Sequence, residues 1–123
     1  MKSEYKGIWR IIKAFGYSWD GLKGAFGSEA AFRQDILFCV IMAGALFFLP
    51  VKGVELALLI FSLFFILLME LVNTGIEAVV DRIGADYHPL SKKAKDIGSL
   101  LVLLSFIYWG ICWGIILIPK VFG

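Results

Sequence analysis

Polar side chains of three chemical kinds gather at the end of a long apolar segment. Glu70, Asn73, Glu77 and Asp81 recur at spacings of three and four residues. An α-helix turns by about 100° per residue, so these side chains share one helical face. A lysine cluster that includes Lys95 follows shortly afterwards. Carboxylates that hold Mg²⁺, a carboxylate base and a lysine that neutralises phosphate charge are the groups that phosphoryl transfer needs.

The composition indicates an integral membrane protein. The chain has 123 residues, of which 60% are hydrophobic and 18% are charged, and this is too apolar for a soluble domain of that length. A net charge of +2, without a basic tail, gives no reason to expect nucleic-acid binding. Cys39 and Cys112 both lie inside apolar runs, so we expect buried thiols and neither a disulfide nor a metal pair.

The hydrophobic pattern predicts an all-α membrane domain that occupies residues 1–123. Residues 1–26 carry apolar side chains at helical spacing with basic residues between them, which predicts an amphipathic helix lying on the membrane surface. Its glycines favour a bent or broken helix over a straight one. Residues 30–49, 53–80 and 97–118 are each long enough to cross a bilayer, which takes about 20 residues. Charges interrupt residues 1–26 too often for a signal peptide.

The distribution of basic residues predicts the orientation. Only Lys52 and Lys120, of the 12 lysines and arginines, fall on the side that holds the 50–53 turn and the C-terminus. Basic residues accumulate on the cytoplasmic side of membrane proteins, so the N-terminus and the 81–96 loop are expected in the cytoplasm. The polar cluster therefore faces the compartment that holds ATP.

Glu70 and Glu77 are expected to lie at different depths in the membrane. Counted from Gly53 at about 1.5 Å per residue, Glu70 lies about 25 Å along its span, near the inner edge of a hydrocarbon core of about 30 Å. An ionisable side chain there is costly and more often functional than decorative. Glu77 lies about 36 Å along, among headgroups and water. Lys95 lies about 35 Å from Ile118 on the next span, at the same inner boundary.

Ordinary structural roles remain open for several of these residues. Lys95 facing Glu77 can be a structural ion pair. Asp81 and Asp86 can be solvated or can pair with nearby basic side chains. His88 can be a loop residue that precedes a proline.

Glu29 and Arg33 are spaced i, i+4 at the cytoplasmic end of the first span. Such a pair is most often a surface salt bridge worth about 0.3 kcal/mol. Glu29 lies at the same depth as Glu77, so the two carboxylates are also candidates to share one metal ion. Neither a Walker A sequence nor a protein-kinase signature is present in the chain.

Small residues indicate close helix contacts. Gly110 and Gly114 form a G-x-x-x-G pattern, and Ala94 and Gly98 repeat the same spacing. Three spanning helices are too few to surround a site that keeps charge away from lipid. Self-association is therefore expected.

Two blocks of sequence closely resemble one family. "MELVNTGIEAVVDRIG" followed by "HPLSKKAKDIGS", with "GYSWDGLKGAF" and "EAAFRQ" upstream, is similar to the bacterial integral-membrane diacylglycerol kinases over nearly the whole chain. The resemblance implies a homotrimer of subunits that each have a surface helix and three transmembrane helices, with active sites shared between neighbours. It also implies transfer of the ATP γ-phosphate to the primary hydroxyl of diacylglycerol, giving phosphatidic acid, in the bacterial inner membrane.

The resemblance assigns a role to each matching position. Glu70 would be the general base, with Asn73 and Lys95 as further catalytic groups, and Glu29 and Glu77 would hold Mg²⁺. Contacts to ATP would come from Arg10, Tyr17, Glu29, Glu77, Asp86, Tyr87, His88, Lys95 and Asp96. Contacts to the lipid would come from Arg10, Ala14, Phe15, Gly16, Tyr17, Ser18, Trp19, Ala31, Phe32, Arg33, Gln34, Asp35, Glu55, Glu70 and Ser99.

Other functions remain open from the sequence. Related small membrane kinases act on undecaprenol, although the "GYSW" and "AFRQ" segments look more like the diacylglycerol branch. A small ion-coupled transporter would explain an acid inside the membrane. It would leave the lysine cluster and the cytosolic depth of Glu77 without a role.

Overall fold

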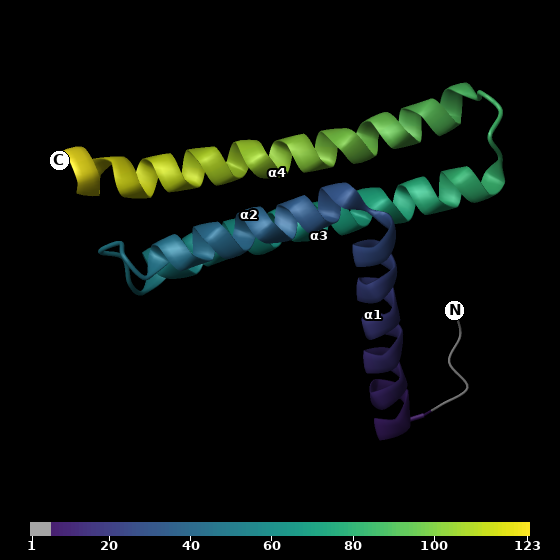
Figure 1. The fold of residues 1–123 in the computed structure, drawn as a ribbon, viewed down its shortest axis with the longest axis horizontal. Coiled ribbons are helices and arrows are strands. Elements are labelled where there is room, and N and C mark those ends of the chain that lie inside the picture. The colour runs from purple at the N-terminus through teal and green to yellow at the C-terminus, as the bar shows by residue number, and fades with distance from the viewer. Residues whose placement is uncertain (1–5) are drawn as a thin grey trace.

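Four helices make up the computed structural model, which describes residues 6–123. They are α1 (Ile8–Ser28), α2 (Ala30–Leu46), α3 (Val54–Ile83) and α4 (Pro89–Phe122). The prediction of an all-α fold is confirmed, since the described part of the chain contains no strand. Figure 1 shows α3 and α4 running in opposite directions, while α1 projects away across the direction of the other helices. α3 packs against both α2 and α4, so it is the central helix.

Two of the helices, α3 and α4, are long and apolar enough to cross a membrane. They have 30 and 34 residues, whereas α2 has 17. The predicted bounds differ from those observed: α2 ends before residue 49, α3 continues past residue 80, and α4 begins well before residue 97. Hydrophobicity marks only the part of a helix that suits lipid, whereas backbone hydrogen bonds continue the helix through charged residues.

The connection between α3 and α4 is much shorter than the predicted 81–96 loop. Only residues 84–88 lie outside the two helices. Pro89 occupies the first turn of α4, and His88 caps the helix by accepting a hydrogen bond at Nδ1 from the Leu90 backbone nitrogen at 3.1 Å. Proline suits a helix start because its missing N–H would have no partner there. The basic cluster is therefore presented by the first turns of a helix.

α1 is one uninterrupted helix, so the prediction of a bend or break at its glycines is wrong. Of the glycines among residues 6–123, only Gly7 and Gly53 have a positive φ, and both precede a helix. A glycine inside a helix costs about 1 kcal/mol relative to alanine, which weakens the helix without preventing it. The apolar stripe of α1 is exposed, with Trp9 and Phe15 at 62% and 74%. Residues 1–5 of the predicted surface segment lie outside the described residues.

A single extended residue, Glu29, separates α1 from α2. The Arg33 guanidinium spans this corner by donating hydrogen bonds to the carbonyl oxygens of Phe26 and Gly27, at 2.6 and 3.2 Å. These carbonyls end α1 and have no partner within the helix, so a cation is favourable there. Arg33 therefore secures the corner, whereas the sequence suggested an ion pair with Glu29.

The core lies where α2, α3 and α4 meet. Leu59 and Ile66 are fully buried on α3, and the Trp113 indole of α4 donates a hydrogen bond from Nε1 to Ser62 Oγ at 2.8 Å. Cys39 and Cys112 are buried free thiols, as predicted.

Two neighbouring tryptophans provide a test of this core. Trp113→Phe is expected to lower the free energy of unfolding by about 1 kcal/mol more than Trp109→Phe, because it leaves Ser62 without its donor. Trp109 Nε1 is buried without a hydrogen-bond partner in the described chain, so Trp109→Phe removes no such bond. Denaturant unfolding in detergent micelles measures both variants. Equal losses of unfolding free energy in the two variants would show that the hydrogen bond to Ser62 does not stabilise the fold.

Candidate functional site

The acidic face of α3 is present as predicted. Glu70 and Asn73 are buried, at 5% and 9% exposed, although both are polar. The Asn73 side chain donates a hydrogen bond from Nδ2 to Glu77 Oε1 at 3.2 Å, one helical turn further along. Burying polar groups is costly unless partners or function compensate. The structure therefore supports a functional role for this face.

Asp35 of α2 joins the same cluster. Its carboxyl interacts with that of Glu70 through charge and at hydrogen-bonding range. The packing register explains this contact, because Cys39, one turn further along α2, donates a hydrogen bond from Sγ to the Leu63 carbonyl of α3 at 3.5 Å. Two adjacent carboxylates repel each other unless a proton or cation lies between them.

Reasoning from the residues alone missed the pairing of Asp35 with Glu70. The resemblance placed Asp35 only among the lipid-side contacts. Asp35 is an acid within the apolar segment 30–49, and this was the signal that could have marked it.

The ion pair that Lys95 makes on the basic side of the site differs from the one suggested by the sequence. Lys95 contacts Asp81, at 2.7 Å between Nζ and Oδ1, although the sequence suggested that it faces Glu77. Lys95 donates a hydrogen bond to Asp81, and the negative charge of Glu77 also acts on the same ammonium group. Lys92 pairs with Asp96 at 2.6 Å. Both pairs are partly exposed, so they are weak and exchangeable.

The predicted nucleotide contacts lie together beside these lysines. Asp86, Tyr87 and His88 are exposed in the short connection between α3 and α4. Together with Lys95 and Asp96 they line a cavity of about 370 Å³. The capping hydrogen bond gives His88 a structural role, which the sequence had left open for that residue.

Other predicted positions lie on α1 or elsewhere on α2 and α4. Arg10 and the segment 14–19 lie on the exposed helix α1, which projects away from the bundle in Figure 1. Ala31, Gln34 and Ser99 are exposed, whereas the Phe32 side chain is 2% exposed and packs inside the chain.

Glu55 lies near the opposite end of α3 from Glu77. It pairs there with Lys120, at 3.0 Å between Oε1 and Nζ. Fifteen residues separate it from Glu70, or about 22 Å along the helix. The structure therefore does not bring Glu55 to the acidic cluster.

The carboxylates are chemically suited to a nucleotide-bound Mg²⁺. Within residues 6–123, no three acidic, histidine or cysteine side chains lie close enough to form a complete metal site. Mg²⁺ in phosphoryl-transfer sites needs only one or two carboxylates, because phosphate and water oxygens supply the other ligands. Glu29 and Glu77 are both half-buried, and Glu77 accepts a hydrogen bond from Asn73.

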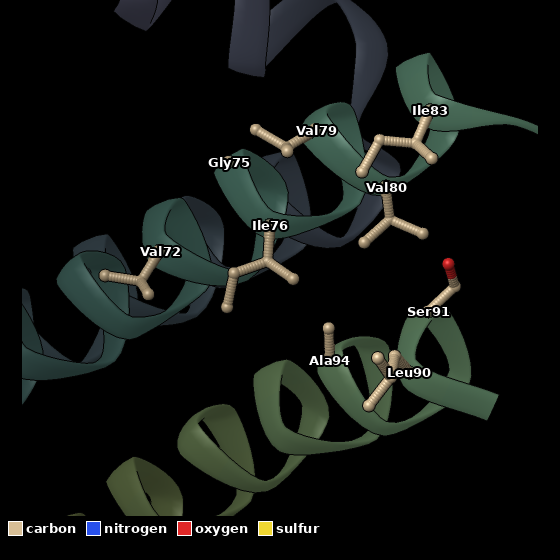
Figure 2. Close-up of a pocket in the computed structure, with 9 residues that line it drawn as sticks. All are labelled: Val72, Gly75, Ile76, Val79, Val80, Ile83, Leu90, Ser91 and Ala94. Carbon is tan, nitrogen blue, oxygen red and sulfur yellow. The ribbon is translucent and has the colours of Figure 1, made fainter. Parts of the chain in front are cut away.

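An apolar cavity of about 580 Å³ lies along α3. Figure 2 shows that residues of α3 and of the start of α4 line this cavity, among them Gly75, Val79 and Ala94. Ser91 contributes the one hydroxyl drawn there. Glu70, Asn73, Glu77 and Lys95 are not among its lining residues, although Val80 and Ser91 line both this cavity and the one beside Lys95.

The fold and the polar cluster define a helical protein of membrane character with groups suited to phosphoryl transfer. The family model for prokaryotic diacylglycerol kinase matches residues 16–117. A diacylglycerol kinase of Escherichia coli K12 is 47% identical over 120 residues, which cover 95% of this chain and 96% of the relative. A diacylglycerol kinase of Helicobacter pylori J99 is 42% identical, with 96% and 92% covered, and one of Pseudomonas aeruginosa is 43% identical, with 91% of each covered.

The chain belongs to the prokaryotic diacylglycerol kinase family. The resemblance in the sequence motifs is thereby confirmed, and the chain is a kinase, a phosphate-transferring enzyme.

Proposed function

We propose that this chain transfers the γ-phosphoryl group of ATP to the primary hydroxyl of diacylglycerol, giving phosphatidic acid, in a Mg²⁺-dependent reaction. The observation that carries the proposal is the polar cluster of buried Glu70 and Asn73 with half-buried Glu77, which lies on the α3 end that also holds the Asp81–Lys95 pair. The similarity to diacylglycerol kinases over nearly their full length supports the choice of substrate.

The reaction would take place at the cytoplasmic face of the bacterial inner membrane. α2, α3 and α4 would cross the bilayer, since the 17 residues of α2 reach the lower limit for a span. α1 runs across the direction of these helices and exposes an apolar stripe, so it would lie on the membrane surface. The excess of lysine and arginine favours a cytoplasmic N-terminus.

Each polar residue of the cluster has a chemical task in this proposal. Glu70 would accept the proton of the lipid hydroxyl as the oxygen attacks the γ-phosphorus. Lys95 would exchange its exposed partner Asp81 for phosphate oxygens. Asn73 would hold the Glu77 carboxylate through their hydrogen bond.

Glu29 and Glu77 would hold Mg²⁺ with the nucleotide. The ion would neutralise charge on the phosphates of ATP. Most of the rate enhancement would then come from positioning and from charge stabilisation in a site that excludes water.

A complete site would require a homotrimer. Glu29 lies at the α1–α2 corner, while the lysines lie at the start of α4, and no extensive contact joins α1 to α4 among residues 6–123. Gly110 and the neighbouring Ile111 are exposed on α4 and are available for contact with another subunit. A neighbouring subunit would shield the acids from lipid, as the cost of charge in a membrane requires.

Phosphorylation of separate lipids by γ-labelled ATP tests the proposal. Purified protein in mixed micelles is expected to label diacylglycerol, giving labelled phosphatidic acid, and to lose this activity with a chelator. Label in undecaprenyl phosphate instead would identify the other acceptor. No label in either lipid, with folded protein, would contradict the kinase assignment, and ion movement in sealed vesicles without ATP would favour a transporter.

A further inference from the structure

A close contact between α3 and α4 in the polar cluster is made by a residue without a side chain. Gly98 is buried on α4 and lies against Asn73. A Cβ atom at position 98 would overlap Asn73 Oδ1 and would lie 3.2 Å from Asn73 Cγ. The Asn73 backbone contributes as well, since its Cα would be 3.6 Å away. Any other residue at position 98 would therefore displace the Asn73 amide.

This contact determines how the amide of Asn73 is oriented. Its Oδ1 atom is buried against α4 without a hydrogen-bond partner in the described chain. Its Nδ2 atom donates to Glu77 Oε1. A buried acceptor without a partner is unfavourable, so hydrogen bonding of Oδ1 does not account for its place against α4.

The other glycines of the α4 span make no such contact. A Cβ at Gly110 would meet nothing within 4 Å, and one at Gly114 would meet only Ile118 of its own helix. The small-residue spacing of Ala94 and Gly98 suggested close helix contact, and Gly98 makes that contact within the chain. Gly44 of α2, where a Cβ would also meet nothing within 4 Å, lies outside the proposed site and the α4 contact and therefore provides a control.

We propose that Gly98 is a positioning residue, which holds the Asn73 amide against α4 and thereby directs its NH₂ group onto the Glu77 carboxylate. Gly98 touches neither substrate nor metal in this proposal and acts through Asn73. The inference rests on the proposed function, because it assigns the Glu77 carboxylate to Mg²⁺ and ATP. It explains why a helix with room for side chains elsewhere carries a glycine at this position.

Alanine substitution at the two glycines tests the contact. Gly98→Ala is expected to raise the KM for Mg-ATP, and the Mg²⁺ concentration for half-maximal activity, by at least about tenfold, which is within the range of couplings between touching residues. kcat at saturating Mg-ATP should fall less. Gly44→Ala should leave both quantities unchanged. If Gly98→Ala behaves like Gly44→Ala, the proposal is wrong.

A double-mutant cycle separates positioning from a general packing defect. Asn73→Ala removes the atoms that an alanine at position 98 would overlap. Adding Gly98→Ala to Asn73→Ala is therefore expected to leave the KM for Mg-ATP unchanged and not to destabilise the chain, since alanine is itself favoured over glycine inside a helix. A second loss of similar size in the Asn73→Ala background would show that Gly98 acts on something else, and this would overturn the proposal.

The cycle is also measured by denaturant unfolding, which needs no activity. If the wild-type chain phosphorylates no lipid, the proposed function fails. Gly98→Ala should still destabilise the wild-type chain more than the Asn73→Ala chain. Equal destabilisation in both backgrounds would show that the contact with Asn73 is not what excludes a side chain at position 98.

Discussion

Glu70→Gln is expected to reduce phosphoryl transfer to diacylglycerol by about 10²- to 10⁴-fold, the usual contribution of a positioned general base. The amide has nearly the same shape as the carboxyl group, so a glutamine side chain fits the buried position on α3. It cannot accept the hydroxyl proton during the reaction. Initial rates under saturating Mg-ATP measure the loss, and binding of a fluorescent ATP analogue should be unchanged.

A carboxylate outside the cluster provides the control for this variant. Asp20 is exposed on α1 and pairs only loosely with Lys23, at 3.7 Å. Asp20→Asn makes the same chemical change and should keep the wild-type rate. If Glu70→Gln and Asp20→Asn both retain the wild-type rate, another residue must be the base. Asp35, whose carboxyl interacts with Glu70, would be the next candidate.

The polar face of α3 was predictable from spacing alone. Glu70, Asn73 and Glu77 were expected on one side of a helix, and the 3.2 Å hydrogen bond between Asn73 and Glu77 shows that they share it. This works because a helix has a fixed period, so three- and four-residue spacings determine relative directions. The apolar span from residue 97 missed the start of α4, although Pro89 suits the first turn of a helix and marks that start in the local sequence.

Contacts between helices were not predictable in the same way. The partner of Lys95 is Asp81, one turn beyond the expected Glu77, because the relative height of α3 and α4 depends on packing along their whole length. The interaction of Asp35 with Glu70 depends likewise on the register between α2 and α3. A shift of one turn is about 5.4 Å, and no local pattern in the sequence specifies it.

The continuity of α1 shows the limit of residue propensities. Glycines at positions 16, 21, 24 and 27 suggested a break, yet the helix continues through all of them. Each glycine costs about 1 kcal/mol, whereas leaving the helix exposes backbone groups that need new partners. Propensity therefore indicated where α1 is weakest and gave the wrong conclusion about whether it is continuous.

Glu77→Gln is expected to raise the Mg²⁺ concentration for half-maximal activity by at least about tenfold, an effect comparable to the lower range for altered metal sites. The glutamine side chain keeps an oxygen that can accept the hydrogen bond from Asn73 Nδ2, so the local packing is retained. The ion pair of Lys95 with Asp81 is also retained, since Glu77 is not its direct partner. What the substitution removes is the negative charge that a hard divalent cation prefers.

A carboxylate one turn further along the same face shows whether this effect belongs to Glu77. Asp81→Asn removes an equal charge near the same helix end and breaks the pair with Lys95. If Glu77 is a ligand, its variant should shift the Mg²⁺ titration, whereas Asp81→Asn should change mainly the KM for ATP through Lys95. Equal shifts of the Mg²⁺ titration in both variants would mean that overall negative charge attracts the ion. An unaltered titration in Glu77→Gln would remove Glu77 from the metal site, and Asn73 would then hold Glu77 for a structural reason.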